Sequence, residues 1–211
     1  MFSVNGEVVK TLGTKVSGED IITVNGHQLT KESYEYYLLN KPREYICSVN
    51  DEFKRKVVTD LIATNKRIYP VGRLDYDTTG LLILTNDGTL ANILMHPKNG
   101  VEKTYVAKIE GNLTMEELHK LKMGIVIDGV LCKPLRVKIK KHDIIKCVDI
   151  VEVVITEGRN HIVKNLFKAV NHEVIKLKRE KYGFLELGNL KSGEYRPLSI
   201  KEVHRLYAYK K

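Results

Sequence analysis

The chain has 211 residues, of which 43% are hydrophobic and 29% are charged, and this ordinary globular balance excludes disordered, collagen-like and low-complexity classes. A chain of this length can bury a sizeable core in one or two domains, and its longest purely apolar run, residues 81–84, is far shorter than the ~20 residues that span a bilayer. The net charge is +9, and residues 159–211 carry +8 of it, with 13 basic and 5 acidic side chains. This concentration of positive charge indicates a polyanionic binding partner such as a nucleic acid, and a solvated basic tail is the alternative.

Two short hairpins are the first predicted elements. Asn5-Gly6 and Asn25-Gly26 each lie among β-branched residues, and Asn-Gly in that setting is a strong hairpin signal. Residues 1–30 are therefore predicted to form a small β-rich unit, with polar residues 30–33 as a linker to a main domain at residues 34–211. The first residues lack the basic and then apolar pattern of a signal peptide.

The main domain is predicted to alternate strands with a few helices. Capping boxes at Thr114 with Glu117 and at Ser199 with Glu202 predict two helix starts, and apolar spacing predicts a further helix over residues 161–170. Apolar or alternating runs predict strands at residues 36–39, 68–71, 81–85, 104–110, 135–140 and 148–155. This mixture is typical of an α+β fold with a mainly antiparallel sheet and a few flanking helices.

A polar loop at residues 72–80 lies between two apolar strands, which is where site residues are commonly found. Asp75 and Asp77 fit the first half of a calcium loop, but the twelfth position is Asn86 instead of glutamate and the flanks read as strands, so we do not expect calcium there. A pair of turn-capping aspartates is the structural alternative. The seven histidines show no metal-ligand spacing, and no Gly-Lys-Ser/Thr phosphate loop is present.

The three cysteines, Cys47, Cys132 and Cys147, are odd in number and far apart, with no Cys-x-x-Cys pair. Such cysteines are typical of reduced thiols, so we expect a cytoplasmic protein.

Residues 72–88, GRLDYDTTGLLILTNDG, closely resemble the signature of the ribosomal RNA pseudouridine synthases, in the branch that contains RsuA and RluB. Four weaker blocks stand in the order expected for that family, and together the similarity covers about residues 34–207, with more overall similarity to RluB. These blocks are NKP at residues 40–42, KTY at 103–105, EGRNHIVK at 157–164 and LKR at 177–179.

The resemblance implies the pseudouridine synthase fold with a central RNA-binding cleft, and the isomerisation of a uridine in ribosomal RNA. Such enzymes flip the base, cut its bond to ribose and rejoin it through ring carbon five. No metal, no nucleotide cofactor and no other cofactor is expected, because the reaction involves no net redox change or hydrolysis. We expect ribosomal RNA as the partner, in the large subunit by the likeness to RluB, and a monomeric enzyme.

Three catalytic residues follow from the resemblance. Asp75 either attacks the anomeric carbon as a nucleophile or removes the adjacent ribose proton. Lys164 provides its ion-pair partner, because a carboxylate in a closed pocket otherwise tends to protonate. Tyr105 stacks on the target uracil, although a core tyrosine is the structural alternative. Asp77 is expected to shape the loop, although a glycosidase-like pair of Asp75 and Asp77 is open at this stage.

The resemblance also implies contacts with RNA. Arg73 matches an arginine that occupies the gap left by the flipped nucleotide, where a planar guanidinium can both stack and bind phosphate. The other residues expected to bind RNA come from the weaker blocks: Lys41, Arg159, Asn160, His161, Lys178 and Arg179.

Two departures from the family pattern affect RNA binding. Ile162 and Asn165 stand where relatives commonly have glutamine and a basic residue. Residues 1–30 resemble only the β-rich second half of the S4-like RNA-binding domain that usually begins such proteins, so the helix pair of that domain is expected to be missing. These departures favour the main rival hypothesis, a non-catalytic RNA-binding or ribosome-assembly protein on the same fold, and a small-subunit target is the nearest catalytic alternative.

Overall fold

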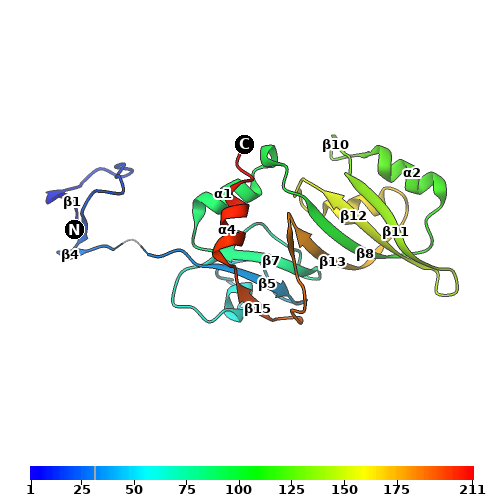
Figure 1. Cartoon of the computed structure of the whole chain (residues 1–211), viewed down its shortest axis with the longest axis horizontal. Helices are drawn as coiled ribbons and strands as arrows, with labels where there is room; N and C mark the ends of the chain where they lie inside the picture. Colours follow the sequence, from blue (N-terminus) through cyan, green and yellow to red (C-terminus); the bar gives the residue numbers. More distant parts are fainter. Residues whose placement is uncertain (31) are drawn as a thin grey trace. The chain divides into compact units, whose positions relative to one another are not determined.

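The computed structural model describes residues 1–30 and 32–211 and divides into two compact units, Met1–Tyr34 and Glu35–Lys211 (Figure 1). The predicted linker at residues 30–33 includes Lys31, which lies outside the described residues.

The first unit is a small antiparallel sheet in the order β2-β1-β3-β4. Its strands are β1 (Phe2–Val4), β2 (Glu7–Val8), β3 (Ile22–Val24) and β4 (His27–Gln28). Both Asn-Gly pairs have positive φ at each residue, 52° and 87° in the first turn and 50° and 82° in the second. Asparagine and glycine tolerate this conformation best, so the two predicted hairpins are confirmed and their turn residues explain them.

The second unit is built on one mixed sheet with the order β11-β12-β8-β13-β7-β5-β15, to which β14 and β6 add at β13 and β7. Every neighbouring pair is antiparallel except β13 with β7, so the predicted mainly antiparallel sheet is confirmed. The strands are β5 (Tyr36–Lys41), β6 (Tyr69–Pro70), β7 (Thr79–Thr85), β8 (Lys103–Glu110), β11 (Arg136–Asp143), β12 (Val148–Ile155), β13 (Val174–Tyr182), β14 (Leu185–Glu186) and β15 (Tyr195–Pro197). A separate hairpin pairs β9 (Ile125–Ile127) with β10 (Val130–Cys132).

Helices cover both faces of this sheet. They are α1 (Gly88–Met95), α2 (Met115–Met123), α3 (Ile162–Lys168) and α4 (Ile200–Tyr207), with 3-10 turns at Val58–Leu61 and Pro97–Asn99. Figure 1 shows α1 beside α4, with which it is in contact, and α2 near β11 at the other end of the unit. Both predicted capping boxes are formed, at the start of α2 and of α4.

The apolar run of β7 is continuous because both faces of the sheet are buried. Leu81 and Ile83 point into one hydrophobic cluster with α1 and α4, whereas Leu82 and Leu84 point into the other with α3. Strand residues alternate between the faces, so a strand covered on both sides needs apolar residues at every position. Within the described part of the chain, no helix is long and apolar enough to cross a membrane.

Candidate active site

Asp75 lies on the loop that joins β6 to β7, and a buried lysine fixes that loop. Lys41, at the end of β5, is fully buried, and its ammonium donates hydrogen bonds to the backbone oxygens of Pro42, Asp75 and Thr78 at 3.0, 3.1 and 2.9 Å. The Thr78 amide also donates to the Asp75 backbone oxygen at 3.0 Å, which closes a turn around the aspartate. The Asp75 side chain, 24% exposed, is thereby presented at the surface of a pocket.

Two basic side chains from the start of α3 approach the Asp75 carboxylate. Lys164 Nζ lies 3.4 Å from Asp75 Oδ2, and His161 Nε2 lies 3.4 Å from Asp75 Oδ1. The predicted pairing of Lys164 with Asp75 is therefore present in the geometry. His161 reaches the carboxylate because it precedes α3 in a left-handed conformation, with φ of 51°. Its position beside Asp75 was not anticipated from the sequence, which marked it only as an RNA contact.

Lys164 is bound more closely by the second aspartate of the loop. Its Nζ donates hydrogen bonds to Asp77 Oδ1 and Oδ2 at 2.7 and 2.9 Å. Partial burial pushes the pKa of Asp77 upward, but the hydrogen bonds and charge of Lys164 outweigh that effect, and the pKa is lowered. Asp77 thus orients the lysine that faces Asp75, which adds a positioning role to the loop-shaping role expected of it.

The pocket beside Asp75 has a volume of about 440 Å³, a size suited to one small planar ligand. Apolar side chains form much of its wall. Its acidic and basic side chains are Arg73, Asp75, Lys103, Arg159, His161 and Arg179. Lys103 belongs to the KTY block of the sequence, which did not predict a role for it. Burial, and then the charge of Arg179, lower the pKa of Lys103 to about 8, while Glu157 opposes the shift.

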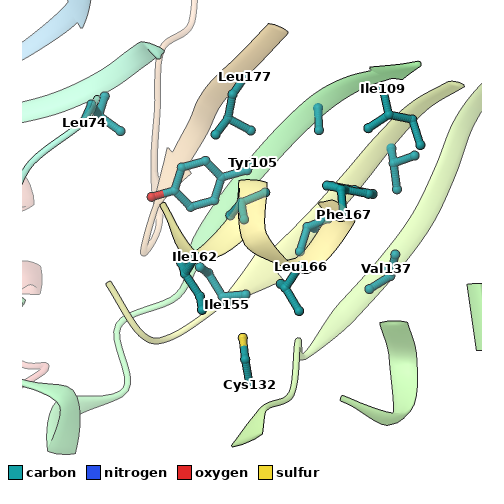
Figure 2. Close-up of a cluster of buried hydrophobic side chains, with 14 of the residues drawn as sticks. Leu74, Tyr105, Ile109, Cys132, Val137, Ile155, Ile162, Leu166, Phe167 and Leu177 are labelled. Carbon is teal, nitrogen blue, oxygen red and sulfur yellow. The ribbon is translucent and has the colours of Figure 1, made fainter. Parts of the chain in front are cut away.

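Tyr105 belongs both to the hydrophobic core and to the pocket wall. Its side chain is 7% exposed, and Figure 2 shows the ring near Leu177 and Ile162, with the hydroxyl turned toward the part of the chain that carries Leu74. The core and pocket interpretations are therefore compatible, because Tyr105 belongs to the core cluster and also lines the pocket.

Three of the residues predicted to bind RNA, Arg73, Asn160 and Arg159, border the pocket or the depression beside it. Arg73 and Asn160 are exposed and border a second, shallower depression next to the pocket, and Arg73 also lines the pocket itself. Arg159 is half-buried, pairs with Glu157 and donates from Nη1 to the Ile127 backbone oxygen at 2.8 Å. Arg159, Asn160 and His161 directly precede α3, whereas Arg73 comes from the loop between β6 and β7.

Three of the predicted RNA contacts differ from the expectation. The prediction for Lys41 is wrong, because the side chain is fully buried and three backbone oxygens already accept its hydrogen bonds. Lys178 lines neither depression, since it alternates along β13 with Leu177 and Arg179, which do face the pocket. Arg179 is 2% exposed and lies in the pocket wall, so it can meet only a part of the RNA that enters the pocket.

Comparison with known proteins identifies the family of this chain. Residues 35–169 match the family model described as RNA pseudouridylate synthase. This chain belongs to the RNA pseudouridine synthase family. It is 50% identical over 206 residues to the ribosomal large subunit pseudouridine synthase B of Bacillus subtilis, covering 97% of this chain and 84% of the relative.

Two further relatives extend the match. An uncharacterized RNA pseudouridine synthase of Aquifex aeolicus is 40% identical over 97% of this chain and 82% of its own length. A crystal structure of a pseudouridylate synthase superposes with a TM-score of 0.76 at 33% identity, covering 97% of this chain and 88% of the other. The chain is therefore an RNA pseudouridine synthase with the fold of that family, an enzyme that isomerises uridine in RNA.

Among residues 1–30 and 32–211, no group of three or more histidine, cysteine or acidic side chains is placed to hold a metal ion. The calcium-like spacing of Asp75 and Asp77 belongs to a loop that enters β7 directly at Thr79.

Proposed function

We propose that this enzyme converts a uridine of large-subunit ribosomal RNA to pseudouridine, with Asp75 as the group that acts on the ribose. The observation that carries the proposal is the placement of the Asp75 carboxylate, at a pocket wall and 3.4 Å from both the Lys164 ammonium and a His161 ring nitrogen. The ribosomal target rests on the 50% identity to the Bacillus subtilis enzyme, whose name states that substrate.

The target uridine must leave its base stack before it can enter a pocket of this size. Arg73 is exposed at the rim and is proposed to take the place of the flipped nucleotide, because a planar guanidinium can stack on bases while it binds phosphate. Arg159, Asn160 and His161 lie nearby and are proposed to contact the RNA backbone.

Inside the pocket, Tyr105 is proposed to stack on the uracil. Asp75 then acts on the ribose, either by attacking the anomeric carbon or by removing the neighbouring ribose proton. Lys164 supplies positive charge beside the carboxylate, and Asp77 holds Lys164 in place. The base turns within the pocket, and its ring carbon five forms the new bond to the ribose. In the same stage the ester to Asp75 breaks, or the ribose takes back its proton. The hydrogen of carbon five then leaves as a proton, and N1 of the base takes up a proton. This sequence needs no cofactor.

The β-rich unit of residues 1–30 is proposed to be a partial S4-like module that adds RNA contacts. We propose that the enzyme acts as a monomer in the cytoplasm, a setting that suits the free thiols of Cys47, Cys132 and Cys147.

A pseudouridine map of ribosomal RNA, from cells with and without this protein, tests the proposal. We expect the deletion strain to lose one large-subunit pseudouridine. The wild-type gene should restore it, and an Asp75→Asn gene should not. Loss of a small-subunit site would correct the target. An unchanged map would favour a non-catalytic RNA-binding protein and contradict the proposal.

A further inference from the structure

Arg179 is a buried cation whose hydrogen-bonding groups are only partly used within the chain. It lies on β13 opposite Tyr105 of β8 and is 2% exposed. Its Nε donates to the Leu81 backbone oxygen at 2.7 Å, and its Nη1 approaches the Tyr105 hydroxyl at 3.4 Å. Its Nη2 is buried and has no hydrogen-bond partner in the part of the chain that the structure describes.

The surroundings of Arg179 do not neutralise its charge. The guanidinium carbon lies 6.0 Å from the centre of the Tyr105 ring and 5.1 Å from that of Tyr182. Within residues 1–30 and 32–211, no carboxylate forms an ion pair with it. A buried unpaired donor costs about 1–3 kcal/mol, and an uncompensated buried charge costs more. Such a group in a pocket wall is expected to be completed by the ligand that enters the pocket.

The chemistry of the reaction indicates what that ligand offers. When the bond between N1 of uracil and the anomeric carbon breaks, its electron pair leaves with the base. The resulting anion spreads its negative charge over N1 and the two carbonyl oxygens, O2 and O4. This holds whether Asp75 attacks the anomeric carbon or removes the ribose proton. A cation in the base pocket therefore meets more negative charge after bond cleavage than before it.

We propose that Nη2 of Arg179 donates a hydrogen bond to a carbonyl oxygen of the flipped uracil and stabilises the uracil anion formed on cleavage. The inference rests on the proposed function, which places uracil in this pocket. The interaction strengthens as the base becomes anionic, so it lowers the barrier more than it tightens binding. Anchoring by Leu81 and the Tyr105 hydroxyl keeps the guanidinium in place before the base arrives.

The pocket holds a second buried cation that raises the local positive potential. Lys103 Nζ donates to the backbone oxygens of Val101 and Thr156 at 3.2 and 2.8 Å. Because backbone oxygens already hold Lys103, we assign the hydrogen bond to the base to Arg179 and not to Lys103.

The first test compares Arg179→Lys and Arg179→Met with the wild type in single-turnover assays. Arg179→Lys keeps a charge but loses the fork of donors. Both variants are expected to lower the single-turnover rate on the order of 100-fold, with the RNA dissociation constant changed by less than about 3-fold. The matched control is Arg205→Lys, since Arg205 stacks on the Phe184 ring at 3.7 Å and does not line the pocket. Wild-type rates in the Arg179 variants would overturn the inference.

A second test uses the unaltered enzyme, because Arg179 variants can also disturb folding. A ribosomal RNA fragment that carries the mapped uridine is synthesised with 2-thiouridine or 4-thiouridine at that position. Sulfur is a weak hydrogen-bond acceptor. We expect one of the two substitutions to slow the wild type by about 10-fold or more, and to have little further effect in a folded Arg179 variant.

The possible outcomes separate this inference from the proposed function. If neither thio substitution slows the wild type, the role of Arg179 is overturned and the proposed function is left intact. The same holds if one substitution slows the wild type and the Arg179 variant equally. No product from the unsubstituted fragment would overturn the proposed function, and this inference with it.

Discussion

Lys164 couples the two aspartates of the loop, and its effect on rate can be separated from any effect on RNA affinity. Lys164→Met removes the cation that lies 3.4 Å from Asp75 and that hydrogen-bonds Asp77. We expect the single-turnover rate to fall on the order of 100-fold, with RNA binding nearly unchanged. Lys168→Met, one turn later on α3 and exposed, is the matched control. A loss of RNA binding with an unaltered single-turnover rate would instead identify Lys164 as a phosphate contact.

Lys103 makes the stability of the protein depend on pH in a predictable direction. Its pKa is lowered from 10.5 to about 8 by burial, assisted by the charge of Arg179 and opposed by Glu157. The unfolded chain therefore binds more protons than the native state between these pH values, so this group raises stability as pH increases through that window. Below about pH 8 the buried Lys103 ammonium is protonated in the native state, and its destabilisation of the folded protein is fully present.

Lys103→Met removes this contribution. The variant is expected to gain stability relative to the wild type at pH 7, by roughly 3 kcal/mol at most, and to lose that relative gain by about pH 10.5. Chemical denaturation at a series of pH values measures the difference. A difference independent of pH would show that Lys103 acts only through its hydrogen bonds to Val101 and Thr156.

At the scale of elements, the parallel contact between β7 and β13 brings the loop that carries Asp75 together with Arg179. Gly80 pairs with Arg179 at this contact and has a φ of 109°. A Cβ atom at Gly80 would lie 2.2 Å from the Arg179 backbone oxygen, so the strands can approach only with glycine here.

Gly80→Ala is therefore expected to separate β7 from β13 and to unfold or strongly destabilise the enzyme. The matched control is Gly193→Ala, at a φ of 86° with nothing within 4 Å of the added atom, which is expected to cost only about 1–2 kcal/mol from backbone strain. Thermal melting of both variants measures the contrast. Equal melting temperatures would contradict the importance of this close approach.

The elements predicted best from sequence are those with a strong local signal. The Asn-Gly turns and both capping boxes are formed as predicted. Helix α1 was missed, although Asp87 caps it by accepting from the Thr89 and Leu90 amides at 3.0 and 3.1 Å. Strand β13 was missed because its alternating lysines and arginines carry little apolar periodicity, and its place is set by its neighbours β8 and β7.

At the scale of the whole molecule, positive charge is concentrated late in the sequence, with +8 of the net +9 in residues 159–211. RNA binding is expected to weaken steeply as salt rises, because each neutralised phosphate releases counterion. Arg73→Gln is expected to reduce the slope of log affinity against log salt by about one. A flat plot for the wild type would remove the electrostatic account of binding.

The site was only partly predictable, because sequence motifs report residue types and not burial. The resemblance predicts Asp75, Tyr105 and Lys164 as catalytic residues. In the structure Asp75 and Tyr105 line the pocket, and Lys164 lies 3.4 Å from Asp75. The resemblance predicts Lys41 and Arg179 as RNA contacts through the NKP and LKR blocks. The structure buries both, so that Lys41 supports the loop and Arg179 forms part of the pocket wall. Lys103 of the KTY block was given no role, because its burial depends on packing between strands that are distant in the sequence.

The central claim is that Asp75 performs the chemistry, and tritium release from ring carbon five of labelled uridine in ribosomal RNA tests it most directly. Asp75→Asn keeps the size and the turn hydrogen bonds but cannot act as an anionic nucleophile or base, so no release is expected, with melting and RNA binding close to wild type. Asp77→Asn, which weakens the hold on Lys164, is expected to retain reduced but measurable release. Wild-type release by the Asp75→Asn enzyme would contradict the account, and complete loss in both variants with unaltered melting would point instead to paired carboxylates.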